Sequence, residues 1–147
     1  MNSVRLVYMN FWGSFLNNMN TPPTPIPAYQ EGYAVAGFNA NNQPIRPQFP
    51  YITYEIARPA FGRFTIVTAS IWDRNVENPG FHGIVDDVLR QVQERIPEGG
   101  LILKLDDGSG AIWLQRNRPN FLAYKDDPSD HTITRGIIFL IVRSHLI

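Results

Sequence analysis

The residues best suited to chemistry lie in the sequence LKLDDGSGAIWLQR, residues 103–116. The adjacent carboxylates of Asp106 and Asp107 precede a Gly-Ser-Gly triplet, a composition shared by metal-binding loops and hairpin turns. An EF-hand loop needs oxygen ligands at alternate positions and a glutamate at the twelfth, and a phosphate-binding loop needs a lysine after its glycines. This stretch has neither, and strand-like sequences flank it. It therefore predicts a hairpin turn rather than a metal or phosphate site.

The histidines and serines add no catalytic pattern. His82 and Asp86 would share one face of a predicted helix, but a stable metal site needs three or four ligands, and spacing fixes no third. His131 lies in a turn-rich loop and His145 in the last residues of the sequence, so both are interpreted as solvated. No serine lies in a Gly-x-Ser-x-Gly elbow, and Lys104 precedes the aspartates, whereas a restriction-type nuclease has its lysine after an acidic residue.

Composition bounds the class of protein. The chain has 147 residues, which fits one domain over residues 1–147, and its 13 basic and 13 acidic residues leave no net charge to hold nucleic acid. It has no cysteine, which excludes disulfides, thiolate nucleophiles and cysteine-ligated zinc. The longest apolar run, residues 136–142, is too short to cross a bilayer, and the N-terminus lacks a signal-peptide pattern. We expect a soluble, unexported protein that is not an enzyme and needs no cofactor.

Two helices are predicted from the spacing of apolar residues. In the first, they recur at three- and four-residue intervals over residues 4–19, and the sequence TPPTPIP at 21–27 ends the helix. This helix has a wide apolar surface, which either meets a partner or is fully buried. The second helix begins at Asn78 and Pro79 and is stopped by Pro97 and the glycines after it. Its apolar stripe comprises Phe81, Ile84, Val85, Val88, Leu89, Val92 and Ile96.

The remaining segments predict strands. Residues 51–59 and 64–73 form an antiparallel pair, and in the second strand Val67, Ala69 and Ile71 share an apolar face that can accept a helix. Further strands are predicted at 101–105, 111–116, about 120–124 and 134–144. The last is apolar on both faces, so its own helices or a neighbouring subunit should cover it. We therefore predict an α+β domain with a mostly antiparallel or mixed sheet of about four to six strands and two main helices packed on it.

A projecting loop is predicted at about residues 30–49. The sequence there has no sustained period, and its two halves can pair across the turn at 39–42, because asparagine tolerates positive φ. The basic stretch QRNR at 115–118 could contact phosphates, but two charges beside a proline favour a solvated strand end. The candidate contact residues for another copy or a partner protein are Tyr33, Phe38, Ile45 and Phe49 from the loop, with Arg116, Arg118 and Phe121.

Four segments in order resemble one protein family. They are IPAYQEGYA at 26–34, FPYITYEIARPAFGRFTIVTASIWDRN at 49–75, IPEGGLILKLDDGSGAIWLQR at 96–116 and TITRGIIFLIVRS at 132–144. Together they resemble the tail terminator and tail-completion proteins of long-tailed bacteriophages and prophages. The departure is VAGFNANNQPIRPQ at 35–48, which looks like an insertion.

The resemblance implies a structural virion protein. Such a protein assembles, usually as a hexameric ring, on the head-proximal end of the tail tube, where it stops tube growth and offers a surface for head attachment. The implied partners are further copies of the chain, the tail tube protein and a head completion or connector protein, while DNA passes through the ring without specific binding. The implied location is the neck of the virion tail, after assembly in the bacterial cytoplasm and without a membrane.

Three alternatives stay open at this point. The chain could be a neighbouring head-to-tail joining protein, a monomeric adaptor, or a small metal-dependent nuclease or hydrolase that uses Asp106, Asp107 and His82. A ring makes the strictest demand on the sequence, because one heterologous interface repeated to closure requires two different complementary patches on each subunit. The projecting loop and the last apolar strand are the predicted patches.

Overall fold

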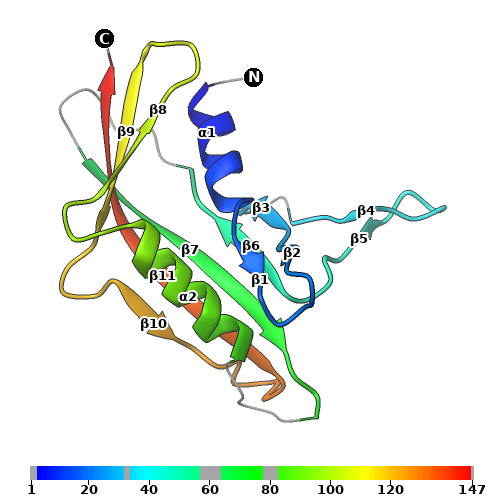
Figure 1. The fold of residues 1–147 in the computed structure, drawn as a ribbon. Coiled ribbons are helices and arrows are strands. Elements are labelled where there is room, and N and C mark those ends of the chain that lie inside the picture. Colours follow the sequence, from blue (N-terminus) through cyan, green and yellow to red (C-terminus); the bar gives the residue numbers. More distant parts are fainter. Residues whose placement is uncertain (1–2, 32–33, 57–63, 78–82, 147) are drawn as a thin grey trace.

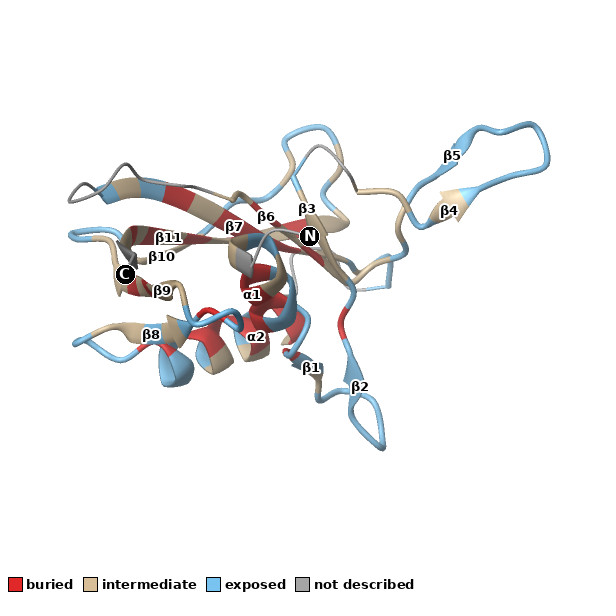
Figure 2. Ribbon diagram, turned by 90° about the horizontal axis from the view of Figure 1, so that it is seen from above, coloured by how far each residue is buried: buried red, intermediate tan, exposed pale blue. Residues whose placement is uncertain are grey.

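The computed structural model describes residues 3–31, 34–56, 64–77 and 83–146 (Figure 1). Helices α1 (Ser3–Trp12) and α2 (Gly83–Arg95) pack on one side of a curled, seven-stranded sheet, and two small hairpins extend from it (Figure 2). The predicted α+β class is confirmed. The strands are β1 (Leu16–Asn17), β2 (Thr24–Pro25), β3 (Ala28–Gln30), β4 (Gly37–Phe38), β5 (Pro44–Ile45), β6 (Tyr51–Tyr54), β7 (Phe64–Arg74), β8 (Leu101–Lys104), β9 (Gly110–Arg116), β10 (Leu122–Tyr124) and β11 (Ile133–Leu146).

The main sheet is organised around β11. Its order is β3-β6-β7-β11-β9-β8, and every pair is antiparallel except β3 with β6. On one edge β11 pairs with β7 from Ile133 to Arg143. On the other edge it pairs first with β10 near Ile137 and then with β9 from Leu140 onward. The sheet has one strand more than the six segments predicted, because β3 is too short to show a periodic pattern.

Helix α2 buries the predicted apolar stripe against β7 and β11. The predicted stripe residues from Ile84 to Ile96 are all buried, as are Val67, Ala69 and Ile71 on the facing side of β7. Gly136 of β11 lies where α2 packs closely on the sheet, since an added Cβ would lie 2.8 Å from Val85 Cγ1 and 3.0 Å from Ile71 Cγ2. The cap at Asn78 and Pro79, the stripe residue Phe81 and the candidate ligand His82 lie outside the described residues.

Helix α1 is shorter than predicted, because it ends at Trp12 rather than near residue 19. Gly13 follows the helix, and the Ser14 hydroxyl donates to the carbonyl of Phe11; both residue types favour helix ends. The chain then extends into β1, yet Phe15 is still fully buried. Phe15 therefore continues the apolar spacing of the helix in the sequence although it lies beyond the end of the helix. Tyr8, Phe11 and Trp12 are buried too, and Trp12 stacks on Tyr54 at 6.3 Å. The aromatic side of this helix is therefore buried, while Met9 and Leu16 are each 39% exposed.

Among the described residues, no helix combines the length and hydropathy needed to cross a membrane.

Candidate functional site

The flap, defined here as residues 34–48, is a small hairpin that extends away from the sheet (Figures 1 and 2). β4 and β5 pair with Gly37 opposite Ile45 and Phe38 opposite Pro44, which confirms the predicted pairing. The Asn39 side chain accepts hydrogen bonds from the amides of Asn41 (2.9 Å) and Gln43 (3.0 Å), and Asn42 has the positive φ, 62°, that the turn requires. Phe38 and Ile45 are 66% and 45% exposed, whereas Tyr33 lies outside the described residues.

The outer face of the sheet, meaning the face opposite both helices, carries apolar side chains from β7, β8 and β11. Side chains alternate along a strand, so the residues of β7 and β11 that do not meet α2 point to this face. Phe64, Ile66 and Ile102 are each more than half exposed. In β11, Ile137 and Ile141 are partly exposed, while Ile138 and Leu140 beside them are buried. The helices of this chain therefore cover one side of the doubly apolar strand (Figure 2).

A row of aromatic and arginine side chains crosses one end of the outer face. Phe49 lies 5.3 Å from Tyr51, and Tyr51 stacks on Trp72 at 6.3 Å between ring centroids. Arginines close both ends of the row: Arg74 lies 5.1 Å from the Phe49 ring, and Arg135 lies 4.4 Å from the Trp72 ring. Phe49, predicted as part of the projecting loop, thus anchors the base of the flap to the sheet.

Trp72 is also fixed by hydrogen bonds around it. Its Nε1 donates to Thr53 Oγ1 at 3.0 Å, and the Arg135 Nε above its ring donates to Ser70 Oγ at 3.0 Å. Since Tyr51 and Arg135 both pack on Trp72, its ring is not an open platform for stacking a nucleotide base. The part of Trp72 that remains accessible is the side of the ring that lines a pocket.

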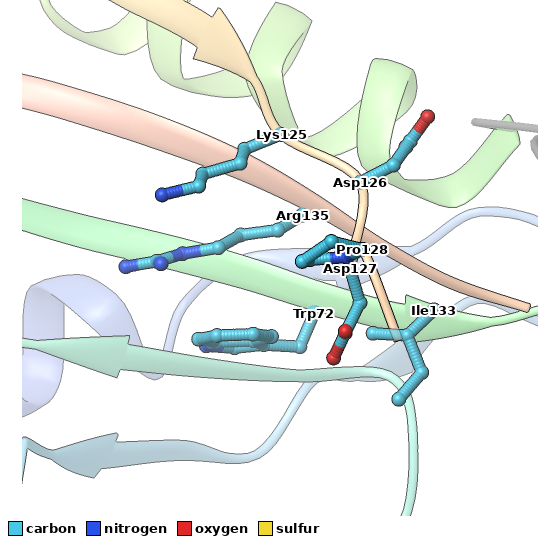
Figure 3. Close-up of a pocket in the computed structure, with 7 residues that line it drawn as sticks. All are labelled: Trp72, Lys125, Asp126, Asp127, Pro128, Ile133 and Arg135. Carbon is cyan, nitrogen blue, oxygen red and sulfur yellow. The ribbon is translucent and has the colours of Figure 1, made fainter. Parts of the chain in front are cut away.

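This Trp72 pocket opens on the outer face and has a volume of about 140 Å³ (Figure 3). Backbone hydrogen bonds from Lys125 to Arg135 (2.8 Å) and from Asp127 to Ile133 (3.3 Å) hold the loop after β10 beside β11 as the pocket wall. The cationic ends of Lys125 and Arg135 extend in the same direction in Figure 3. The lining residues are Trp72, Lys125, Asp126, Asp127, Pro128, Ile133 and Arg135.

The carboxyl groups of Glu31 and Glu55 lie close together near the end of β3, where the chain continues toward the flap. Glu55 accepts hydrogen bonds from the Thr68 amide (3.2 Å) and hydroxyl (3.1 Å). Desolvation raises the pKa of Glu31, as do a hydrogen bond to Glu55 and the negative charge of Glu55, while Arg135 acts in the opposite sense. Across the described part of the chain, no three or more His, Asp or Glu side chains are grouped so that they could hold a metal ion.

The sequence Asp-Asp-Gly-Ser-Gly at 106–110 forms the predicted hairpin between β8 and β9. The Leu105 amide donates to the Gly110 carbonyl at 2.9 Å, and Gly108 has φ of 74°. The Asp107 carboxylate accepts hydrogen bonds from the amide (2.9 Å) and the hydroxyl (2.5 Å) of Ser109. Asp107 therefore stabilises the turn through its own side chain.

Arg116 and Phe121 come together, but around the end of α2. Arg116 Nε donates to the Ile96 carbonyl at 2.7 Å and its Nη2 to the Gln93 carbonyl at 2.9 Å, so the guanidinium caps the C-terminus of the helix. The same guanidinium lies 4.8 Å from the Phe121 ring. Arg118 instead reaches Glu98 at 3.4 Å, with both side chains largely exposed. Sequence reasoning missed this cap, because the two carbonyls lie 20 and 23 residues before Arg116 and only the fold brings them to its side chain.

Comparison with known proteins gives no assignment: no family model, no curated protein and no solved structure matches this chain.

Proposed function

We propose that this chain is a ring-forming tail terminator that caps the head-proximal end of a phage tail tube. The observation that carries the proposal is the presence of two unlike surfaces on one small domain, the flap and the apolar outer face of the sheet. The four segments that resemble the tail terminator and tail-completion family, in their order along the chain, add independent support. The implied partners are further copies, the tail tube protein and a head completion or connector protein, in the neck of the virion.

Two unlike surfaces are what a ring requires. A heterologous contact uses one patch of a subunit against a different patch of the next, and it closes when the rotation per step divides a full turn. A stable contact buries roughly 800 Å² on each partner. The flap extends from the sheet with Phe38 exposed, and the outer face exposes Phe64 and Ile66, so both patches offer apolar area of the kind that such contacts bury.

Two charged residues considered above as a metal ligand and a phosphate contact, Asp107 and Arg116, have structural partners. Asp107 holds its own turn, and Arg116 holds the end of α2. A near-neutral domain also suits a ring through which DNA passes, because it lacks the clustered positive charge that would retain phosphates.

The direct test has two parts. Native mass measurement over a range of concentrations should give a closed ring, about 100 kDa for six copies of the 16.7 kDa chain. Electron microscopy should find the protein at one end of tail tubes from the phage or prophage that encodes it, and tubes polymerised in its presence should be shorter. A chain that stays monomeric alone and with tubes, and binds neither tube end, would overturn the proposal.

A further inference from the structure

We propose that Phe38 on the flap of one copy inserts into the Trp72 pocket of the neighbouring copy. This contact rests on the ring-forming function proposed above, and it specifies which two surfaces meet.

The flap has the features of an element that is completed by a partner. Its strands contain two residues each and pair with each other, not with another described strand. An isolated two-stranded hairpin is only marginally stable in water, so burial elsewhere must favour its ordered form. Phe38 is the largest exposed side chain on it, at 66% exposure. The flap points away from the body of its own chain (Figure 2), which places its tip within reach of another molecule.

The Trp72 pocket suits one aromatic ring. Its volume is about 140 Å³, and an apolar protein cavity of about 150 Å³ is known to accept benzene. Trp72, Pro128 and Ile133 supply apolar contacts. Lys125 and Arg135 place two cations beside the opening, which the carboxylates of Asp126 and Asp127 also line (Figure 3). A cation near an aromatic face is attracted to the ring.

The flap and the Trp72 pocket are different parts of the same chain. In a ring the contact is heterologous, because the flap of one copy enters the pocket of the next copy and is not exchanged in return. Each copy donates one Phe38 and receives another. This arrangement can repeat from subunit to subunit, as a ring requires. A flap-to-flap contact would instead be complete with two copies.

Crosslinking tests the contact directly, because the chain contains no cysteine of its own. We choose Ala40→Cys, at the exposed turn of the flap, and Ser129→Cys, an exposed residue that directly follows the pocket lining. With a short bismaleimide, the double variant should give a ladder of covalent oligomers that ends at the ring. A mixture of the two single variants should give crosslinked dimers, and each single variant alone should give none.

Substitution of Phe38 supplies the second test. In the double-cysteine background, Phe38→Ser should lower the yield of crosslinked oligomers about tenfold to a hundredfold, the factor expected for losing one buried phenyl ring. The matched control is Met19→Ser, which removes a similarly exposed apolar side chain, 60% against 66%, from the turn between β1 and β2 and should leave the yield unchanged. Thermal unfolding of both variants should match that of the parent.

The outcomes separate this contact from the proposed function. If the parent forms rings but the mixed single variants do not crosslink, or Phe38→Ser forms rings as readily as the parent, the contact is wrong and the ring proposal stands. Dimers from Ala40→Cys alone would show a flap-to-flap contact and overturn it as well. A parent that is monomeric both alone and on tube ends overturns the ring, and with it this contact.

Discussion

Replacement of Arg116 by methionine would test whether this arginine belongs to the fold or to an interface. The change keeps most of the aliphatic stem but removes two hydrogen bonds to the end of α2, at 2.7 and 2.9 Å, and the charge beside Phe121. A hydrogen bond from a charged donor contributes about 1.5–3 kcal/mol, and a cation over a partly exposed ring about 0.5–1 kcal/mol. Because water can reach both carbonyls after the change, we expect a total loss of about 2–3 kcal/mol.

The assay is urea and thermal unfolding followed by circular dichroism. For a domain of this size, about 1 kcal/mol corresponds to about 2–4 °C, so the midpoint should fall by roughly 5–10 °C. Arg118→Met is the matched control, because the exposed pair with Glu98 contributes below about 1 kcal/mol. Equal midpoints for the two variants would refute the capping role. Loss of oligomers by Arg116→Met without loss of stability would assign Arg116 to a contact surface instead.

Three further predictions concern packing, the hairpin and pH. Gly136→Ala should cost about 1–3 kcal/mol in urea unfolding, because its Cβ would lie 2.8 Å from Val85 Cγ1. Asp107→Ala should cost about 0.5–1.5 kcal/mol through the lost turn hydrogen bonds, with no change in thermal stability on addition of Mg²⁺ or Mn²⁺ in either protein. The pKa of Glu31 is raised in the folded state, so folding favours the protonated carboxyl group. The stability that this group contributes is present below the ordinary glutamate pKa and is lost as the pH rises through the raised pKa. Glu31→Gln should remove this loss from the free energy of unfolding measured between pH 4 and 7.

The elements with strong periodicity could be predicted from sequence. The stripe of α2 and the alternation in β7 each repeat over enough residues to fix both the type of element and the side that is buried. The flap turn was also predictable, because its asparagines carry a local backbone preference.

The parts that depend on tertiary pairing were not predictable. The predicted end of α1 was wrong, because Phe15 reaches the core from an extended segment that follows the helix. β3 has three residues and is ordered by its pairing with β6. The Trp72 pocket needs Lys125 and Asp127 to lie beside β11, an arrangement that hydrogen bonds across the loop establish. The short strand β3 and the loop that forms the pocket wall leave no periodic signal in the sequence.

The central place of β11 has a consequence for how the protein is made. β11 follows every other described strand in the sequence, and its partners in β7 precede it by about 60 to 80 residues. Until it is synthesised, β3, β6 and β7 on one side have no hydrogen-bonded link to β8 and β9 on the other. A nascent chain on the ribosome therefore carries two bare strand edges, those of β7 and β9, and such edges are prone to aggregation. The sheet can be completed only after residues 133–146 have left the exit tunnel, and chaperone demand should fall from that point.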